Sequence, residues 1–173
     1  MNEGFLNPEE VLKNLKLRKN MSAADLGSGS GGWAIPLAKQ LEDGIVYAVD
    51  ILEEPLSVLK SKALSEKIFN IRTILADAEE SIDLPQGSMD IILMTNLLFQ
   101  VEDKKKVLES GKRFLRQGGK ILVVDWEQNS PLGPKEGRVT TELVKDLASE
   151  IGLKLEKEFS AGSQHYGLIF IKS

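Results

Sequence analysis

The fold is decided by the stretch Asp25-Leu26-Gly27-Ser28-Gly29-Ser30-Gly31-Gly32. An apolar run precedes this stretch, and apolar residues at helical spacing follow it, which is the order of a strand, a turn and a helix. Because glycine has no Cβ atom, such a turn adopts dihedrals that other residues avoid and lets a ligand touch the main chain. The N–H groups at the start of the following helix can bind that ligand. The stretch predicts a cofactor-binding turn, and a tight turn without a ligand is the alternative.

Short runs of β-branched and aliphatic residues, bounded by Gly, Pro, Asp or Ser, indicate seven strands. Amphipathic stretches alternate with most of these runs, and this alternation predicts a mostly parallel sheet covered by helices. Only residues 160–165 separate the last two runs, which is too few for a parallel crossover, so these two are expected to form an antiparallel hairpin. The expected strands are residues 21–26, 45–50, 70–76, 89–95, 120–126, 153–159 and 166–172.

Two stretches predict where helices begin and end. Asn7-Pro8-Glu9-Glu10 combines an N-cap residue, a proline at the first helical position and two acids, so a helix is expected from there through Leu15. Gly118-Gly119 is expected to stop the helix whose apolar face lies within residues 107–115.

Length and composition favour one globular domain over residues 1–173, with a helical segment over residues 1–20. The chain has no cysteine and a single histidine, which excludes disulfides and thiolate nucleophiles, and no metal site is expected. The formal charge of −4 argues against a mainly electrostatic attraction to nucleic acid. No apolar run reaches the roughly 20 residues of a membrane span, and the N-terminus lacks the apolar core of a signal peptide. A cytoplasmic location is therefore expected, whereas the oligomeric state is not indicated.

Gly27, Gly29 and Gly32 also satisfy the G-x-G-x-x-G pattern of dinucleotide-binding proteins. Asp50 ends the second expected strand, where a carboxylate can accept hydrogen bonds from the ribose diol of a dinucleotide or of S-adenosylmethionine (SAM). Three features favour SAM: Asp25 lies two residues before the first glycine, the chain is too short for a dehydrogenase substrate domain, and the sheet ends in a hairpin. A nicotinamide-dependent oxidoreductase and a nucleotide-binding module without catalysis remain the alternatives.

Residues 21–172 resemble the class I SAM-dependent methyltransferases, of the type 11 group that includes the quinone-biosynthesis methylases. The first motif of that family is matched by residues 25–31, the second by Val49-Asp50-Ile51 and the third by Ala76-Asp77-Ala78. The fourth corresponds to residues 89–99, whose strand end faces the sulfonium in the family. The resemblance implies a three-layer, Rossmann-like α/β fold with strand order 3-2-1-4-5-7-6 and an antiparallel strand 7, in agreement with the hairpin.

The resemblance also implies which residues hold SAM and its product S-adenosylhomocysteine (SAH). The Asp25 carboxylate helps to hold the methionine amine, and the glycines lie under the cofactor. Asp50 holds the ribose hydroxyls and Ile51 packs on the adenine. Asp77 accepts from the adenine amino group. The expected cofactor-binding residues are Asp25, Gly27, Gly29, Gly31, Trp33, Asp50, Ile51, Asp77, Ala78 and Asn96.

Each acid also has a structural interpretation. Asp25 can cap the turn that follows it, and Asp77 can begin a solvated, acidic helix start. Asp90 can simply begin a strand. Asp50 has fewer structural uses, because a carboxylate that closes an apolar strand beside a glycine-rich turn favours ribose binding.

Methyl transfer from a sulfonium needs mainly alignment and the exclusion of water, so no fixed catalytic group is expected. A base is needed only where the acceptor loses a proton. The weak candidates for this role are Asn96, Asp125 and His165, and His165 is expected at a hairpin turn in a structural or solvent-exposed role. Arg138 is expected to form a surface ion pair, with binding of an anionic acceptor as the alternative.

The methyl acceptor is expected to be a small molecule. Thr95-Asn96-Leu97-Leu98 stands where amino-methylating enzymes of DNA, RNA and protein glutamine carry Asn/Asp-Pro-Pro-Tyr/Phe, and this difference disfavours that class. The absence of cysteine excludes the cysteine-dependent methylases of this fold. An RNA or protein methyltransferase is retained as the alternative within the family.

Overall fold

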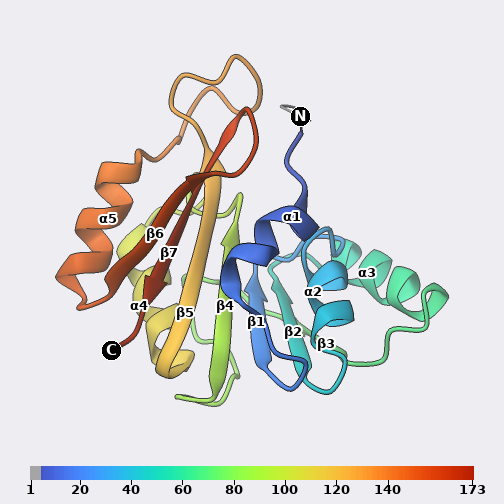
Figure 1. Ribbon diagram of the computed structural model, residues 1–173. Helices are drawn as coiled ribbons and strands as arrows, with labels where there is room; N and C mark the ends of the chain where they lie inside the picture. Colours follow the sequence, from blue (N-terminus) through green and yellow to red (C-terminus); the bar gives the residue numbers. More distant parts are fainter. Residues whose placement is uncertain (1–4) are drawn as a thin grey trace.

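The computed structural model describes residues 5–173 and contains a seven-stranded sheet between two layers of helices (Figure 1). The strand order is β3-β2-β1-β4-β5-β7-β6, and β7 runs antiparallel to both of its neighbours. The predicted Rossmann-like architecture is therefore confirmed. The strands are β1 (Ser22–Leu26), β2 (Ile45–Asp50), β3 (Ile71–Leu75), β4 (Met89–Thr95), β5 (Leu115–Trp126), β6 (Lys154–Ser160) and β7 (His165–Ile171).

The helices divide between the two faces of the sheet. One face is covered by α1 (Pro8–Leu12), α2 (Ala34–Gln40) and α3 (Glu53–Ser65). The other face is covered by α4 (Lys104–Phe114) and α5 (Thr141–Glu150). No helix within residues 5–173 has the length and apolar character that crossing a membrane requires.

The first helix begins as its sequence predicts. The Asn7 side chain accepts hydrogen bonds from the N–H groups of Glu9 and Glu10, and Pro8 occupies the first helical position. A short 3-10 turn, η1 (Lys13–Leu15), continues α1 and buries Leu15 against the sheet. Residues 1–4 of the expected N-terminal segment lie outside the described residues.

The prediction that Gly118-Gly119 ends a helix is wrong. α4 ends at Phe114 and β5 begins at the next residue, so both glycines lie inside the strand. The pairing of β5 with β4 shifts there, from Met89 opposite Leu115 to Ile91 opposite Lys120. A Cβ atom on Gly119 would lie 3.0 Å from the Met89 carbonyl oxygen. The glycines are therefore required by a bulge and a close backbone approach.

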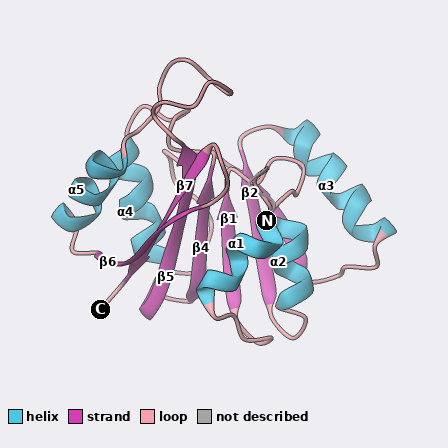
Figure 2. Cartoon of the chain, turned by 45° about the horizontal axis from the view of Figure 1, so that its top comes forward, coloured by secondary structure: helices cyan, strands magenta, loops and turns pink. Residues whose placement is uncertain are grey.

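The parallel strands β1 to β5 all end at one edge of the sheet, called here the carboxyl edge. The turn between β6 and β7 reaches the same edge, because His165 pairs with Trp126 at the end of β5. Figure 2 shows the loops after β5 and between β6 and β7 gathered above the strand ends. In sheets of this kind the ligand site lies at the carboxyl edge.

Candidate functional site

A cavity of about 380 Å³ lies at the carboxyl edge, beside the ends of β1, β2 and β3. Its lining includes six of the ten residues expected to bind the cofactor. The other four, Asp25, Gly31, Trp33 and Asn96, do not line it. The lining residues are Gly27, Gly29, Asp50, Ile51, Leu52, Pro55, Ala76, Asp77, Ala78, Glu79, Leu97, Gln100 and Val101.

The glycine-rich turn is tied to the end of β2 by its backbone. The N–H groups of Gly27 and Ser28 both donate to the Val49 carbonyl oxygen, at 2.8 and 2.9 Å. Gly27 has a φ of 75° and would place a Cβ atom 2.9 Å from Leu97. The turn therefore needs glycine both for its conformation and for its approach to the segment after β4.

Asp50 is fixed at the edge of the cavity by two backbone groups. Its Oδ2 atom accepts from Gly29 N–H at 2.8 Å, and its Oδ1 atom accepts from Leu52 N–H at 3.0 Å. Each carboxylate oxygen keeps a further acceptor position. The neighbouring Ile51 is 60% exposed, which leaves an apolar surface beside the carboxylate. The pair suits a ligand with a diol next to an apolar ring.

Asp77 and Ala78, which follow β3, also line the cavity. The Asp77 Oδ1 atom accepts from Glu79 N–H at 2.8 Å, so this carboxylate is also held by the backbone. Ala78 is buried. No helix begins at Asp77 in the structure, and the expected alternative of an acidic helix start does not apply.

Asp25 lies behind the glycine-rich turn and is completely buried. Neither of its carboxylate oxygens accepts a hydrogen bond from the described residues, so it does not cap the turn. Burial, and secondly the charge of Asp50, raise the pKa of Asp25 to about 8. The carboxyl group is therefore largely protonated at neutral pH.

We expect Asp25 to make stability fall as the pH rises. The folded-state pKa lies above the unfolded value, so the contribution is complete below pH ~4 and is lost as the pH rises towards about 8. Asp125, whose pKa burial raises to about 6, acts in the same direction over the lower part of this range. Asp25→Asn should therefore weaken the pH dependence of the thermal unfolding midpoint between pH 6 and 8, measured by differential scanning calorimetry. The exposed Asp83→Asn is the control; parallel curves for wild type and Asp25→Asn would contradict the assignment.

Polar atoms without hydrogen-bond partners gather at the carboxyl edge. Within residues 5–173, the buried side-chain atoms of this kind are both Asp25 oxygens, Ser28 Oγ, Asn96 Oδ1 and His165 Nε2. Each costs about 1–3 kcal/mol when it stays unsatisfied. Asp25 lies near the end of β1, Ser28 and Asn96 follow β1 and β4, and His165 begins β7. The arrangement therefore fits a polar ligand laid along this edge.

Gly31 and Trp33 have packing roles in the structure. A Cβ atom on Gly31 would lie 3.0 Å from Leu59, so this glycine lets the turn approach α3. Trp33 is buried in the same apolar cluster as Val11 and Leu12 of α1. The structure therefore separates both residues from the cavity.

The three candidates for a catalytic role lie at the carboxyl ends of β4 and β5 and at the start of β7, which are neighbours in the sheet. Asn96 follows β4 with a φ of 50°, and its N–H donates to the Val124 carbonyl oxygen of β5 at 2.7 Å. Asp125 near the end of β5 is buried, and its carboxylate accepts from the N–H groups of Trp126 and Phe99. These hydrogen bonds favour the charged form but do not offset burial.

His165 was expected in the hairpin turn, but it begins β7 and its side chain is only 5% exposed. Its ring lies 4.2 Å from the Trp126 ring, centroid to centroid, at an angle of 39°. Burial lowers the pKa of His165, which favours the neutral form of the imidazole. His165 and Trp126 thus form an aromatic pair at the carboxyl edge.

Asp90 lies at the opposite edge of the sheet. Its Oδ2 atom accepts from Ser22 N–H at 2.8 Å and lies 2.9 Å from Arg116 Nη2. This carboxylate joins β1, β4 and β5, in agreement with the structural interpretation.

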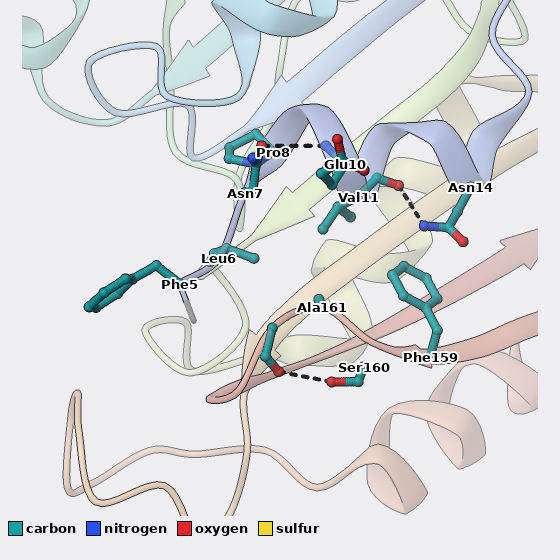
Figure 3. A pocket seen from close by; sticks show the side chains of 11 residues that line it. Phe5, Leu6, Asn7, Pro8, Glu10, Val11, Asn14, Phe159, Ser160 and Ala161 are labelled. Carbon is teal, nitrogen blue, oxygen red and sulfur yellow. Dashed lines mark hydrogen bonds between the residues drawn. The ribbon is translucent and has the colours of Figure 1, made fainter. Parts of the chain in front are cut away.

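A second, larger cavity of about 950 Å³ lies between the N-terminal segment and the end of β6. Leu6 and Val11 line one side, and Phe159 and Ala161 line the other. Figure 3 shows Phe159 and Asn14 at one end of this cavity, whereas Phe5 projects away from it. The cavity offers a mixed polar and apolar surface close to the β6–β7 turn.

A family model described as "Methyltransferase domain" matches residues 17–166. Demethylmenaquinone methyltransferase of Bacillus mycoides (strain KBAB4) is 27% identical over 154 residues, which cover 88% of this chain and 65% of that protein. The same-named protein of Geobacillus sp. (strain WCH70) is 27% identical over 72% of this chain and 53% of that protein. The chain therefore spans between about half and two thirds of the length of these curated relatives.

Solved structures share the whole fold. A SAM dependent methyltransferase from Aquifex aeolicus superposes with a TM-score of 0.90 at 26% identity, over 99% of this chain and 92% of that one. Haemonchus contortus phosphoethanolamine N-methyltransferase 2 in complex with S-adenosyl-L-methionine has a TM-score of 0.81 at 17% identity, over 98% of this chain and 53% of that one. The second likeness concerns the fold alone.

Proposed function

The chain belongs to the methyltransferase domain family, and from this premise we propose that it transfers a methyl group from SAM to a small-molecule acceptor in the cytoplasm. The observation that carries the proposal is the cavity at the carboxyl edge, whose lining includes Asp50 and Ile51 after β2 and Asp77 and Ala78 after β3. These four residues stand at the positions that the methyltransferase motifs assign to the ribose and adenine.

The backbone-fixed carboxylates suit the adenosine part of SAM. Asp50 is proposed to accept from the two ribose hydroxyls, and its orientation is set in advance by Gly29 and Leu52 N–H. Ile51 is proposed to offer an apolar face to the adenine, and Leu97 and Val101 add apolar lining to the same cavity. Asp77 is proposed to accept from the adenine amino group. Preset groups of this kind lose little entropy on binding.

Asp25 and Asn96 are proposed to serve the methionine part. Both carry buried oxygens without partners, and Asp25 lies next to the turn that Gly27 and Gly29 keep open. A positive amine near Asp25 would lower the pKa of its carboxyl group, because the charged form gains an opposite charge. Binding would then release a proton from Asp25.

When bound, SAM supplies a methyl group that its sulfonium already activates. The protein's own part is then to align the acceptor and exclude water. Asp125 and His165 flank the acceptor side, and neutral His165 can accept a proton where the acceptor is a hydroxyl. The Asp125 carboxylate is less suited to act as a base, because it already accepts from two backbone N–H groups.

The acceptor is proposed to be a planar, reduced quinone or a related small aromatic molecule. The names of the curated relatives support this class, and so does the aromatic pair Trp126–His165. RNA or protein substrates are the second candidate within the family. A nicotinamide oxidoreductase is disfavoured by the family match, which covers residues 17–166.

Methyl-labelled SAM tests the proposal. The protein and labelled SAM are incubated in four separate reactions, each with one acceptor. The acceptors are 1,4-naphthoquinol, an organic metabolite extract, cellular RNA and cellular protein. Label in the naphthoquinol or the metabolite extract is the expected result. Label confined to RNA or protein would contradict the acceptor class, and no label in any fraction would contradict the activity.

A further inference from the structure

The connection between β5 and α5, residues 127–140 and called here the β5–α5 loop, is folded around one side chain. The Arg138 guanidinium donates to five backbone carbonyl oxygens of this loop. Among residues 5–173 it forms no ion pair, so the expected surface ion pair is wrong. The acceptors are Pro134 (2.6 Å), Ser130 (2.7 Å), Gln128 (3.0 Å), Glu127 (3.2 Å) and Leu132 (2.5 Å).

The arrangement uses all three nitrogens of the guanidinium. Nε donates to Pro134 and Nη2 to Leu132, while the two N–H groups of Nη1 are shared among Glu127, Gln128 and Ser130. A lysine ammonium has three N–H groups on a single atom and cannot span these directions. Hydrogen bonds from a charged donor are also about twice as strong as neutral ones. Arg138 therefore fixes the course of a loop that has no helix or strand of its own.

The loop packs on two residues of the carboxyl edge. A Cβ atom on Gly133 would lie 2.6 Å from the Trp126 ring, and one on Gly137 would lie 2.4 Å from the Phe99 carbonyl oxygen. Phe99 belongs to the segment after β4, whose residues Leu97 and Val101 line the cofactor cavity. The loop thus touches both the aromatic pair and the back of the cofactor segment.

Both ends of the loop are anchored to β7 and the turn before it. The Ser130 hydroxyl lies 2.5 Å from the Gln164 side-chain oxygen, and the Tyr166 hydroxyl donates to the Val139 carbonyl oxygen at 2.8 Å. Figure 1 shows the loop rising above the ends of β5 and β7. A loop fixed here forms a wall beside Trp126 and His165.

We propose that Arg138 is a positioning residue for methyl transfer: its five carbonyl contacts hold the β5–α5 loop against Trp126 and Phe99 as the acceptor-side wall of the site. The inference rests on the proposed function for the identity of the site. The Arg138 guanidinium is bonded to carbonyl oxygens of its own loop, and Arg138 does not line the cofactor cavity. Its loss should therefore alter acceptor binding and leave cofactor binding in place.

The loop's order is tested without turnover. Hydrogen exchange of the peptide covering residues 127–140 is compared for wild type, Arg138→Ala, Arg138→Lys and the control Lys135→Ala, which removes an exposed cation of the same loop. We expect at least about tenfold faster exchange in both Arg138 variants, since the carbonyl contacts are lost. Guanidinium at about 20 mM, far below denaturing concentrations, should slow the exchange of Arg138→Ala towards the wild-type rate. It should leave the exchange of Lys135→Ala and of the wild type unchanged. Unchanged exchange, or no rescue, would overturn the proposal.

Steady-state kinetics test whether the loop positions the acceptor. With labelled SAM and 1,4-naphthoquinol, Arg138→Lys should raise the acceptor KM by about tenfold or more, because a displaced wall misaligns the acceptor. SAH affinity by calorimetry and the KM for SAM should stay within about twofold of wild type. Loss of SAH affinity in parallel would show a general structural defect and overturn the positioning role. If the wild type does not methylate naphthoquinol, the metabolite extract serves as acceptor. If neither is methylated, the proposed function is refuted. The hydrogen-exchange rates and their rescue by guanidinium then still decide whether Arg138 orders the loop.

Discussion

Asp50→Ala is expected to weaken SAM and SAH binding by about 100-fold, because two hydrogen bonds from ribose hydroxyls to a charged acceptor contribute about 1.5 kcal/mol or more each. Asp50 also accepts from Gly29 N–H, so the substitution removes a tie between the glycine-rich turn and the end of β2. The turn keeps its two bonds to the Val49 carbonyl oxygen, and the fold should therefore remain intact.

Calorimetry with SAH measures this effect directly. Asp50→Asn keeps the shape of the side chain but loses its charge, and an intermediate affinity is expected. Asp146→Ala removes an exposed carboxylate of α5 and should bind SAH like the wild type. If Asp50→Ala folds normally and binds SAH with unchanged affinity, Asp50 does not hold the ribose.

Gly44→Ala is expected to lower the free energy of unfolding by about 3 kcal/mol or more, through forced overpacking of the backbone. A Cβ atom at this position would lie 1.9 Å from the Met21 carbonyl oxygen. The contact is with backbone, so no side-chain rotation relieves it. Gly44 directly precedes β2, and the pairing of Ser22 with Ile45 would have to open.

Thermal unfolding measures the second effect. For a chain of this size, about 3 kcal/mol corresponds to a decrease in Tm of roughly 6–12 °C. Gly32→Ala is the matched control, because a Cβ atom there meets nothing within 4 Å. Its Tm should change by no more than about 2 °C. Equal Tm values for Gly44→Ala and Gly32→Ala would contradict the packing described at the start of β2.

The parts of the site that follow strand ends could be predicted from the sequence. Asp50 and Asp77 each come directly after an apolar run, and parallel strands bring such positions to one edge. The cavity indeed has both carboxylates in its lining. Trp33 shows where this reasoning stops, because helical periodicity identifies a buried face but not the element that covers it. Trp33 lies in the buried cluster that also contains Val11 and Leu12 of α1.

The cavity lining continues beyond the fourth motif to Gln100 and Val101, which the sequence did not indicate because neither residue belongs to a motif. The segment after β4 turns back towards the cavity through Gln100 N–H, which donates to the Leu97 carbonyl oxygen, and through Phe99 N–H, which donates to Asp125. The role of Arg138 was equally hidden. Its partners are backbone carbonyls, which every residue has, so no residue pattern marks them.

Binding of SAH and NADH, measured by calorimetry on the same preparation, tests the central claim most directly. The two ligands share an adenosine, so the proposed roles of Asp50 and Asp77 apply to both. Only SAH carries the amino acid that we propose to lie beside Asp25 and Asn96. We expect clear binding of SAM and SAH, and no measurable heat from NADH. Tight binding of NADH together with silence towards SAM and SAH would contradict it.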